Sequence, residues 1–375
     1  MPQRFVHSEP SLRPPIELKQ GRVSYRGGFR QLRSELKLIA ILFLIILSGV
    51  LGFLLFAPTL LKPEPNQGVC SIQLQGRVPL PNTSGRIDHM DFDVSKQLLF
   101  VASLGNNSVS IVDVEKGMFQ GSVIGVKGPQ GVVFAKPYHR VYVSNVGDGT
   151  VYVYNETSLS HPAVIQLPAS SGADNLRLSS DSSRLFVGYG SGGIASIDTA
   201  NDKILWSTAL IGHPESFQFD PSSNRLYANV PAGNYVVVLD AANGTIISRW
   251  PIVGATGNYA MAIDEVHARL FVATRLPSEM FVIDTANGGT VATFPLSSDS
   301  DDIFLDSGSG CIYASAGEGL VDVIKQVNPD TYSVLSPVPT SPGARTSLFD
   351  PVSKRLFVAD PGSNHQGYIW VYSTR

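Results

Sequence analysis

Short hydrophobic runs recur along the chain with a regular period. Each run contains one aromatic residue among β-branched or aliphatic neighbours, at Phe100, Tyr142, Phe186, Tyr227, Phe271, Tyr313 and Phe357, and consecutive aromatics are 41 to 44 positions apart. Each copy holds short segments with strand-like patterning, for example MDFDV, LLFVAS, VSIVDV and GSVIGV in the first. Four strands per copy are typical of one blade of a β-propeller. The sequence therefore predicts an all-β, seven-bladed β-propeller.

Polar residues mark the turns between the predicted strands. In five copies an Asp stands seven residues before the aromatic, and in five copies an Asp or Asn stands twelve or thirteen residues after it. The first set is Asp93, Asp220, Asp264, Asp306 and Asp350, and the second is Asp113, Asn155, Asp198, Asp240 and Asp284. Asp and Asn side chains accept hydrogen bonds from backbone amides in such turns. We interpret these ten residues as turn formers.

The two ends of the repeat region complement each other. The seventh copy ends at Tyr372 after three predicted strands, and the segment Ser71–Leu80 (SIQLQGRVPL) resembles the fourth strands of other copies. We expect this N-terminal segment to complete the last blade by pairing antiparallel with Gly367–Tyr372. Such closure would remove an open sheet edge.

An uncharged, apolar segment precedes the repeats. Residues 38–61 contain 24 residues without a charge, enough for a helix that crosses the hydrocarbon core of a bilayer. The leader, residues 1–37, is basic, which predicts a cytoplasmic N-terminus. We expect an uncleaved signal anchor at 38–61, a short Pro-rich tether at 62–69 and the propeller at 70–375. This arrangement predicts a single-pass protein of the cell (inner) membrane whose propeller faces the periplasm or the cell exterior.

One copy carries a family motif. The segment Val126–Asn155, VKGPQGVVFAKPYHRVYVSNVGDGTVYVYN, resembles the YVTN-repeat (YncE-like) β-propellers, with VYVSN at the position of the name-giving motif. The resemblance covers about residues 70–375. It implies a propeller outside the cytoplasm or at the cell surface, and it implies no particular activity. Similar propellers include lyases, lactonases and oxidoreductase subunits, but their cofactor motifs are absent from this sequence.

Charge excludes one class of partner. Residues 1–62 carry nine Lys+Arg and three Asp+Glu, so the remainder carries 28 − 9 = 19 basic and 31 − 3 = 28 acidic residues. Residues 1–62 are therefore near +6 and the remainder, which holds the propeller, is near −9. A net negative domain gains little from neutralising phosphates, and we predict no nucleic-acid partner.

Two cysteines, Cys70 and Cys311, lie far apart in the sequence. They form neither a CxxC pair nor a cluster with metal-ligand spacing. We expect two isolated thiols, with one long-range disulfide as the alternative if the compartment is oxidising.

Candidate binding residues come from one position of the repeat. Twelve residues before each aromatic, where the innermost strand begins, the seven copies place Asp88, Gln130, Asp174, Glu215, Tyr259, Asp301 and Arg345. We expect these residues to form a ring at one mouth of the propeller channel. The four carboxylates would attract a cation or a basic ligand group, with Arg345 as a counter-charge. A solvated loop rim is the alternative interpretation.

Catalytic and metal-binding candidates lie beside the same ring. His89 is the candidate acid or base, with Glu215 across the ring, and Asp301 with Asp302 are the candidate ligands of a divalent cation. No HExxH, GxSxG, Walker or CxxCH motif occurs. We predict no cofactor other than, in the enzymatic alternative, a divalent cation.

Two functions remain after these observations. The first is a binding or scaffold module that presents one propeller face to a protein, an envelope polymer or a small ligand. The alternative is a propeller enzyme, a lyase or hydrolase, that uses a divalent metal held by carboxylates at the channel mouth. The absence of a catalytic motif favours the binding module.

Overall fold

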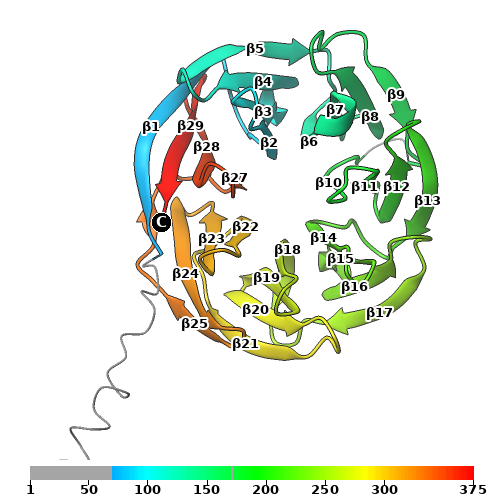
Figure 1. The fold of residues 1–375 in the computed structure, drawn as a ribbon, viewed down its shortest axis with the longest axis vertical. Coiled ribbons are helices and arrows are strands. Elements are labelled where there is room, and N and C mark those ends of the chain that lie inside the picture. Colours follow the sequence, from blue (N-terminus) through cyan, green and yellow to red (C-terminus); the bar gives the residue numbers. More distant parts are fainter. Residues whose placement is uncertain (1–69, 170–171) are drawn as a thin grey trace, which may run out of the picture. The chain divides into compact units, whose positions relative to one another are not determined.

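The computed structural model describes residues 70–169 and 172–375, and these form a seven-bladed β-propeller (Figure 1). Seven antiparallel sheets surround a central channel, and each has at least four strands. Blades 1 to 6 follow one another in chain order, and blade 7 combines strands from both ends of the described chain. The predicted fold class is confirmed.

The inner half of each blade consists of its innermost strand and the strand that follows it in the chain. The innermost strands of blades 1 to 7 are β2 (Met90–Asp93), β6 (Pro129–Ala135), β10 (Leu176–Leu178), β14 (Phe217–Asp220), β18 (Thr256–Asp264), β22 (Ser300–Asp306) and β27 (Ser347–Asp350). The second strands are β3 (Leu98–Ser103), β7 (Arg140–Asn145), β11 (Arg184–Tyr189), β15 (Arg225–Val230), β19 (Arg269–Leu276), β23 (Cys311–Ala316) and β28 (Arg355–Ser363).

The outer half of each blade has a third and a fourth strand. The third strands are β4 (Ser108–Asp113), β8 (Thr150–Asn155), β12 (Gly193–Asp198), β16 (Tyr235–Asp240), β20 (Ser278–Asp284), β24 (Leu320–Asn328) and β29 (Gln366–Thr374). The fourth strands are β5 (Met118–Ile124), β9 (Ala163–Gln166), β13 (Lys203–Ala209), β17 (Ile246–Pro251), β21 (Thr290–Pro295), β25 (Thr331–Val334) and β1 (Ile72–Pro81). The remaining elements are β26 (Val338–Pro339), which pairs with β24, and the 3-10 helices Leu104–Asn106, Lys136–Tyr138 and Pro231–Gly233.

The repeated aromatic residues lie between blades. All seven are essentially inaccessible to solvent, and each belongs to a different hydrophobic cluster shared by two neighbouring blades. Phe357 of blade 7, for example, contacts Phe92 of blade 1 with ring centroids 5.1 Å apart. Each cluster thus buries apolar surface from two sheets at once, which stabilises the ring rather than single blades.

Arginines add polar links between successive blades. In four copies an arginine two residues before the aromatic donates to the turn after the third strand of the next blade. These arginines are Arg140, Arg184, Arg225 and Arg269. Their acceptors are backbone oxygens in three cases and the Asp330 carboxylate in the fourth.

The predicted turn residues make the expected hydrogen bonds. Asp93 Oδ1 accepts from the backbone amide of Ser95 at 2.9 Å, and Asp240 Oδ1 accepts from that of Ala242 at 2.7 Å. Equivalent bonds recur at the other eight positions. Their structural role is confirmed.

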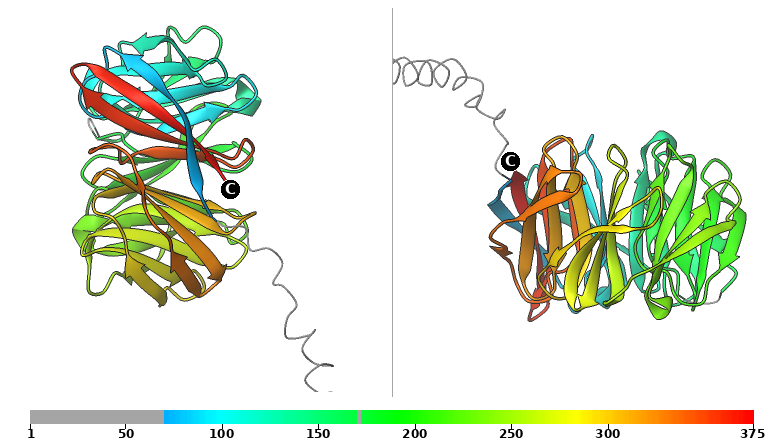
Figure 2. Two further views of the ribbon diagram at one scale, coloured as in Figure 1. Left: turned by 90° about the vertical axis from the view of Figure 1, so that its left-hand side faces the viewer. Right: turned by 90° about the horizontal axis from the view of Figure 1, so that it is seen from below.

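The N-terminal strand closes the ring. β1 pairs antiparallel with β29, from Ile72 opposite Thr374 to Pro81 opposite Gln366, and Figure 2 shows the two strands side by side. The predicted closure is confirmed. Because the last blade draws strands from both ends of this region, opening the ring would expose an unpaired sheet edge.

A disulfide joins Cys70 to Cys311, with their Cα atoms 5.6 Å apart. Both residues are buried in the cluster between blades 6 and 7. The expectation of two isolated thiols is therefore wrong. Sequence separation concealed the pair, because ring closure places the start of the propeller beside β23.

Within the two described ranges, no helix is both long enough and apolar enough to cross a membrane. The predicted anchor at 38–61, with its leader and tether, lies outside the described residues.

Replacing the pair, Cys70→Ala with Cys311→Ala, should lower the free energy of unfolding by about 2–4 kcal/mol, because the disulfide closes a long loop in the unfolded chain. Denaturant titration of the oxidised protein and the variant measures this difference. Reductant should destabilise the wild-type protein by a similar amount and leave the variant unchanged. Equal midpoints for oxidised wild type and variant would refute the stabilising role.

Candidate functional site

The seven ring residues lie where the innermost strands begin, at one end of the channel. Four of them stand two positions before an innermost strand: Asp88 before β2, Asp174 before β10, Glu215 before β14 and Arg345 before β27. The other three lie within an innermost strand: Gln130 in β6, Tyr259 in β18 and Asp301 in β22. We call these residues, with Arg86, Arg275 and Asp299, the channel mouth. Asp88 is fully buried, Arg86 is exposed, and the other members are buried or partly exposed.

Arg86 shows that the mouth is narrow. Its Nη2 atom lies 3.0 Å from Asp88 Oδ2 in blade 1 and 3.9 Å from Asp301 Oδ2 in blade 6. Burial lowers the pKa of Arg86, but Asp88, Asp301, Asp174 and Glu215 together outweigh it and raise the pKa. Side chains from blades that are not neighbours therefore converge.

Three arginines neutralise much of the predicted acidic ring. Asp301 Oδ1 lies 2.8 Å from Arg275 Nη2, and its Oδ2 lies 3.2 Å from Arg345 Nε. Both arginines also contact Asp299, at 3.0 and 2.9 Å. The expectation of four carboxylates with one counter-charge is thus corrected: Arg86 and Arg275 join Arg345, and the blade 5 to 7 side of the mouth is an ion-pair network.

His89 lies between two carboxylates. Its Nε2 atom is 3.6 Å from Asp88 Oδ1, and its Nδ1 atom is 3.5 Å from Asp302 Oδ1. Burial lowers the pKa of His89, but Asp302 and then Asp88 outweigh it and raise the pKa to about 10. The raised pKa favours the imidazolium, whose lone pair is occupied by a proton, and this disfavours a general-base role for His89.

Glu215 is the least neutralised acid of the mouth. It forms no ion pair with any residue in the described ranges, although Asp174 nearby accepts from His213 Nε2 at 3.1 Å. Burial, followed by the charges of Asp174 and Asp301, raises the pKa of Glu215 to about 7 despite the opposing effect of His213. The structure therefore associates Glu215 with His213 and not with His89, its predicted partner.

The two uncharged ring residues play smaller parts. Gln130 contributes its backbone oxygen, which accepts from His89 N at 3.1 Å. Tyr259 presents its ring to the guanidinium carbon of Arg275, 3.6 Å from the ring centroid, in a cation–π contact. This contact, together with Asp299 and Asp301, holds Arg275 in the mouth.

The candidate metal ligands already have partners. Asp301 contacts arginines, and Asp302 Oδ2 accepts from the backbone amide of Ser347 at 2.9 Å. Among residues 70–169 and 172–375, no group of three or more His, Cys, Asp or Glu side chains is arranged to hold a metal ion.

Sequence reasoning missed Arg86 and Arg275. Arg275 does carry a signal: it stands four residues after the repeated aromatic, where the other six copies have Leu, Val, Gly or Pro. Arg86 stands two residues before a ring position and outside any strand, so periodicity alone does not mark it.

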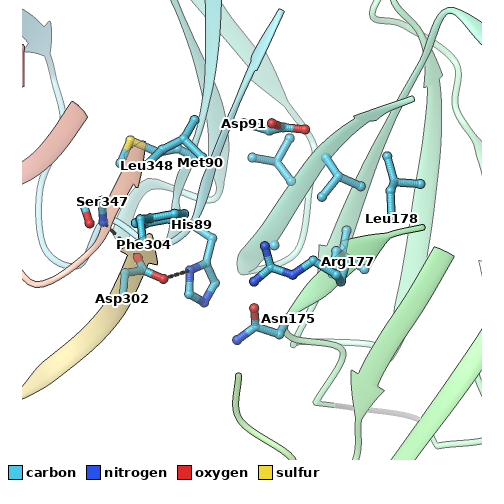
Figure 3. A pocket seen from close by; sticks show the side chains of 14 residues that line it. His89, Met90, Asp91, Asn175, Arg177, Leu178, Asp302, Phe304, Ser347 and Leu348 are labelled. Atoms are coloured by element: carbon cyan, nitrogen blue, oxygen red, sulfur yellow. Dashed lines mark hydrogen bonds and ion pairs between the residues drawn. The ribbon is translucent and has the colours of Figure 1, made fainter. Parts of the chain in front are cut away.

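A cavity of about 210 Å³ lies in the channel next to the mouth. Innermost strands of blades 1, 2, 3, 6 and 7 line it, and His89 and Asp302 belong to its wall (Figure 3). Arg177 and Asn175, from blade 3, point into it from the opposite wall. His89 thus contacts both the mouth, through Asp88, and the cavity.

The fold and this site define a seven-bladed β-propeller with a charged channel mouth. Among curated proteins, the chain is similar to the uncharacterized protein YncE of Salmonella typhimurium and to its counterpart in Salmonella typhi. Each is 21% identical over 254 residues, covering 64% of this chain and 71% of the relative. This similarity confirms the resemblance to YncE-like propellers drawn from the repeat. No family model matches the chain.

Solved structures show the same architecture. A chain of the mitotic checkpoint complex superposes with a TM-score of 0.67 at 14% identity, covering 82% of this chain and 95% of that one. A chain of Kuenenia stuttgartiensis hydrazine synthase superposes with a TM-score of 0.66 at 17% identity, covering 83% of this chain and 98% of that one. At such identities the likeness is one of fold alone.

The raised pKa of Glu215 predicts a pH-dependent stability. The folded protein binds the proton on Glu215 more tightly than the unfolded chain does, and this binding stabilises the folded state. The stabilisation is complete below about pH 4.5 and is lost as the pH rises through about 7. Glu215→Gln, which mimics the protonated acid, should change stability little at pH 4.5. At pH 8 it should raise the free energy of unfolding by about 3 kcal/mol, because a pKa difference of one unit corresponds to about 1.4 kcal/mol. Denaturant titrations at both pH values measure the difference.

Glu115→Gln, at an exposed position after β4, is the matched control and should show no such pH dependence. If Glu215→Gln and wild type keep the same difference in stability at both pH values, Glu215 titrates normally and the argument fails.

Proposed function

We propose that this protein is a membrane-anchored, extracytoplasmic binding module whose channel mouth captures a protonated amine, such as a lysine side chain of a protein partner. The YncE-like β-propeller fold supports a binding or scaffold role. The ligand class follows from the charges at the mouth, and the anchoring follows from the sequence at 38–61.

One observation supports the ligand class: the negative charges of buried carboxylates at the mouth are not fully balanced by hydrogen bonds and ion pairs from described residues. Neither oxygen of Asp88 accepts a hydrogen bond from a described residue, even though Arg86 lies 3.0 Å away. Glu215 has no ion pair in the described part of the chain, and burial raises its pKa. An uncompensated buried carboxylate costs free energy, and a ligand amine beside Glu215 and Asp174 would reduce that cost.

The disulfide supports a location outside the cytoplasm. Stable disulfides form mainly in oxidising compartments such as the periplasm or the cell exterior, and Cys70–Cys311 lies at the start of the propeller. This agrees with the orientation predicted from the basic leader and the apolar segment.

An amine probe tests the ligand class directly. Nα-acetyl-lysine methylamide should bind the purified full-length chain, and Glu215→Gln should weaken its binding at least tenfold, because a charge-assisted hydrogen bond is lost. Calorimetric titration at pH 8 measures both affinities. Binding should also weaken as salt concentration rises.

The Nε-acetylated form of the probe is the control ligand, and Glu115→Gln is the control variant. Equal binding of the acetylated probe would refute amine recognition. In the same assay, saturable binding of Ca²⁺, Mg²⁺ or Zn²⁺ that disappears in Asp301→Asn would instead favour the enzymatic alternative, in which a carboxylate-held metal serves a lyase or hydrolase.

The anchor predicts how the chain partitions in cells. The full-length chain should stay with the membrane fraction after an alkaline wash, and a chain lacking 38–61 should leave it, because the apolar segment alone would span the bilayer. A reporter enzyme that requires an oxidising compartment should be active when fused after Arg375. Recovery of the full-length chain in the soluble fraction would contradict the anchor.

A further inference from the structure

Arg177 faces the channel cavity without a counter-ion. It belongs to β10 of blade 3, and its Nε atom donates to the backbone oxygen of Phe217 at 3.3 Å. It forms no ion pair with any carboxylate in the described ranges. Burial lowers the pKa of Arg177, and the charges of Asp302 and Asp91 oppose this effect only in part. A guanidinium remains charged under these conditions, so the cavity contains a positive charge without close compensation.

The two carboxylates whose charges act on Arg177, Asp302 and Asp91, already have other partners. Asp91 accepts backbone amides with both oxygens, from Phe92 at 2.8 Å and from Phe134 at 2.6 Å. Asp302 accepts from Ser347 N at 2.9 Å and lies 3.5 Å from the His89 imidazole. Neither acid therefore pairs with Arg177.

The rest of the cavity wall is suited to a ligand with a polar end and an apolar part. Asn175 lies beside Arg177 and points into the same space, and the His89 ring faces them from blade 1 (Figure 3). Much of the remaining lining is apolar, with Met90, Leu176, Leu178, Phe304 and Leu348. Pockets for small molecules combine such apolar walls with a few directed polar groups.

We propose that the channel cavity is a second binding site that takes a small organic carboxylate, with its anionic group on Arg177 and Asn175 and its apolar part against the aliphatic wall. The planar guanidinium matches the geometry of a carboxylate and offers two parallel hydrogen bonds. The volume of about 210 Å³ suits a short-chain or single-ring acid. This site takes an anion, whereas the site proposed at the mouth takes an amine, so different probes test the two sites.

Calorimetric titration of the full-length chain with benzoate and with propionate tests the proposal. At least one of them should bind, and benzamide, the neutral counterpart of benzoate, should bind at least tenfold more weakly. Arg177→Gln should weaken carboxylate binding at least tenfold and leave binding of the lysine probe at the mouth unchanged. Arg249→Gln, at an exposed position of β17, is the matched control and should change neither.

A second variant keeps the proposal testable if Arg177→Gln does not fold. Leu348→Phe narrows the cavity from blade 7 and leaves every charge in place, so it should weaken benzoate binding with Arg177 intact. Thermal unfolding of each variant without probe verifies its folding. The proposal is overturned if wild type binds neither carboxylate, if benzamide binds as well as benzoate, or if a folded Arg177→Gln variant keeps full affinity. Binding of inorganic phosphate alone would likewise overturn the carboxylate assignment.

Discussion

The structure depends on packing between blades. A four-stranded sheet has two apolar faces and cannot bury both by itself, so each blade needs a neighbour on either side. The seven repeated aromatics supply this contact, one at each interface, and all are buried. Closure follows from the same requirement, because blades 1 and 7 would otherwise expose a face. The pairing of β1 with β29 and the Cys70–Cys311 disulfide secure the ring where the two ends of the described chain meet.

Ring closure also creates the electrostatic site. Strands that are far apart in sequence all begin at the same end of the channel, so residues at one repeat position converge. Arg86 contacts acids of blades 1 and 6 at once, which only a narrow mouth allows. In such a confined, partly buried space, like charges raise one another's carboxyl pKa and opposite charges form networks. The mouth is therefore divided: arginines compensate the acids on one side, while Glu215 on the other has no ion pair within the described ranges.

The mouth and the cavity have opposite electrostatic character although they share His89. Its imidazolium links Asp88, at the mouth, with Asp302, in the cavity wall. This arrangement places a fixed positive charge between a region rich in carboxylates and a region that contains Arg177. The two proposed ligands, an amine and a carboxylate, follow from this separation.

The repeat determined the fold. Seven aromatics at a steady spacing, turn-forming acids at fixed offsets and a missing last strand were sufficient to predict the blades, the closing strand and the ring of residues at the mouth. These features are local or periodic, so they can be recognised from the sequence alone. Only the tertiary structure decided the pairing of Cys70 with Cys311, the recruitment of Arg86 and Arg275, and the position of Arg177 in a cavity. Each of these depends on which blades face one another across a closed ring, and sequence distance does not report that proximity.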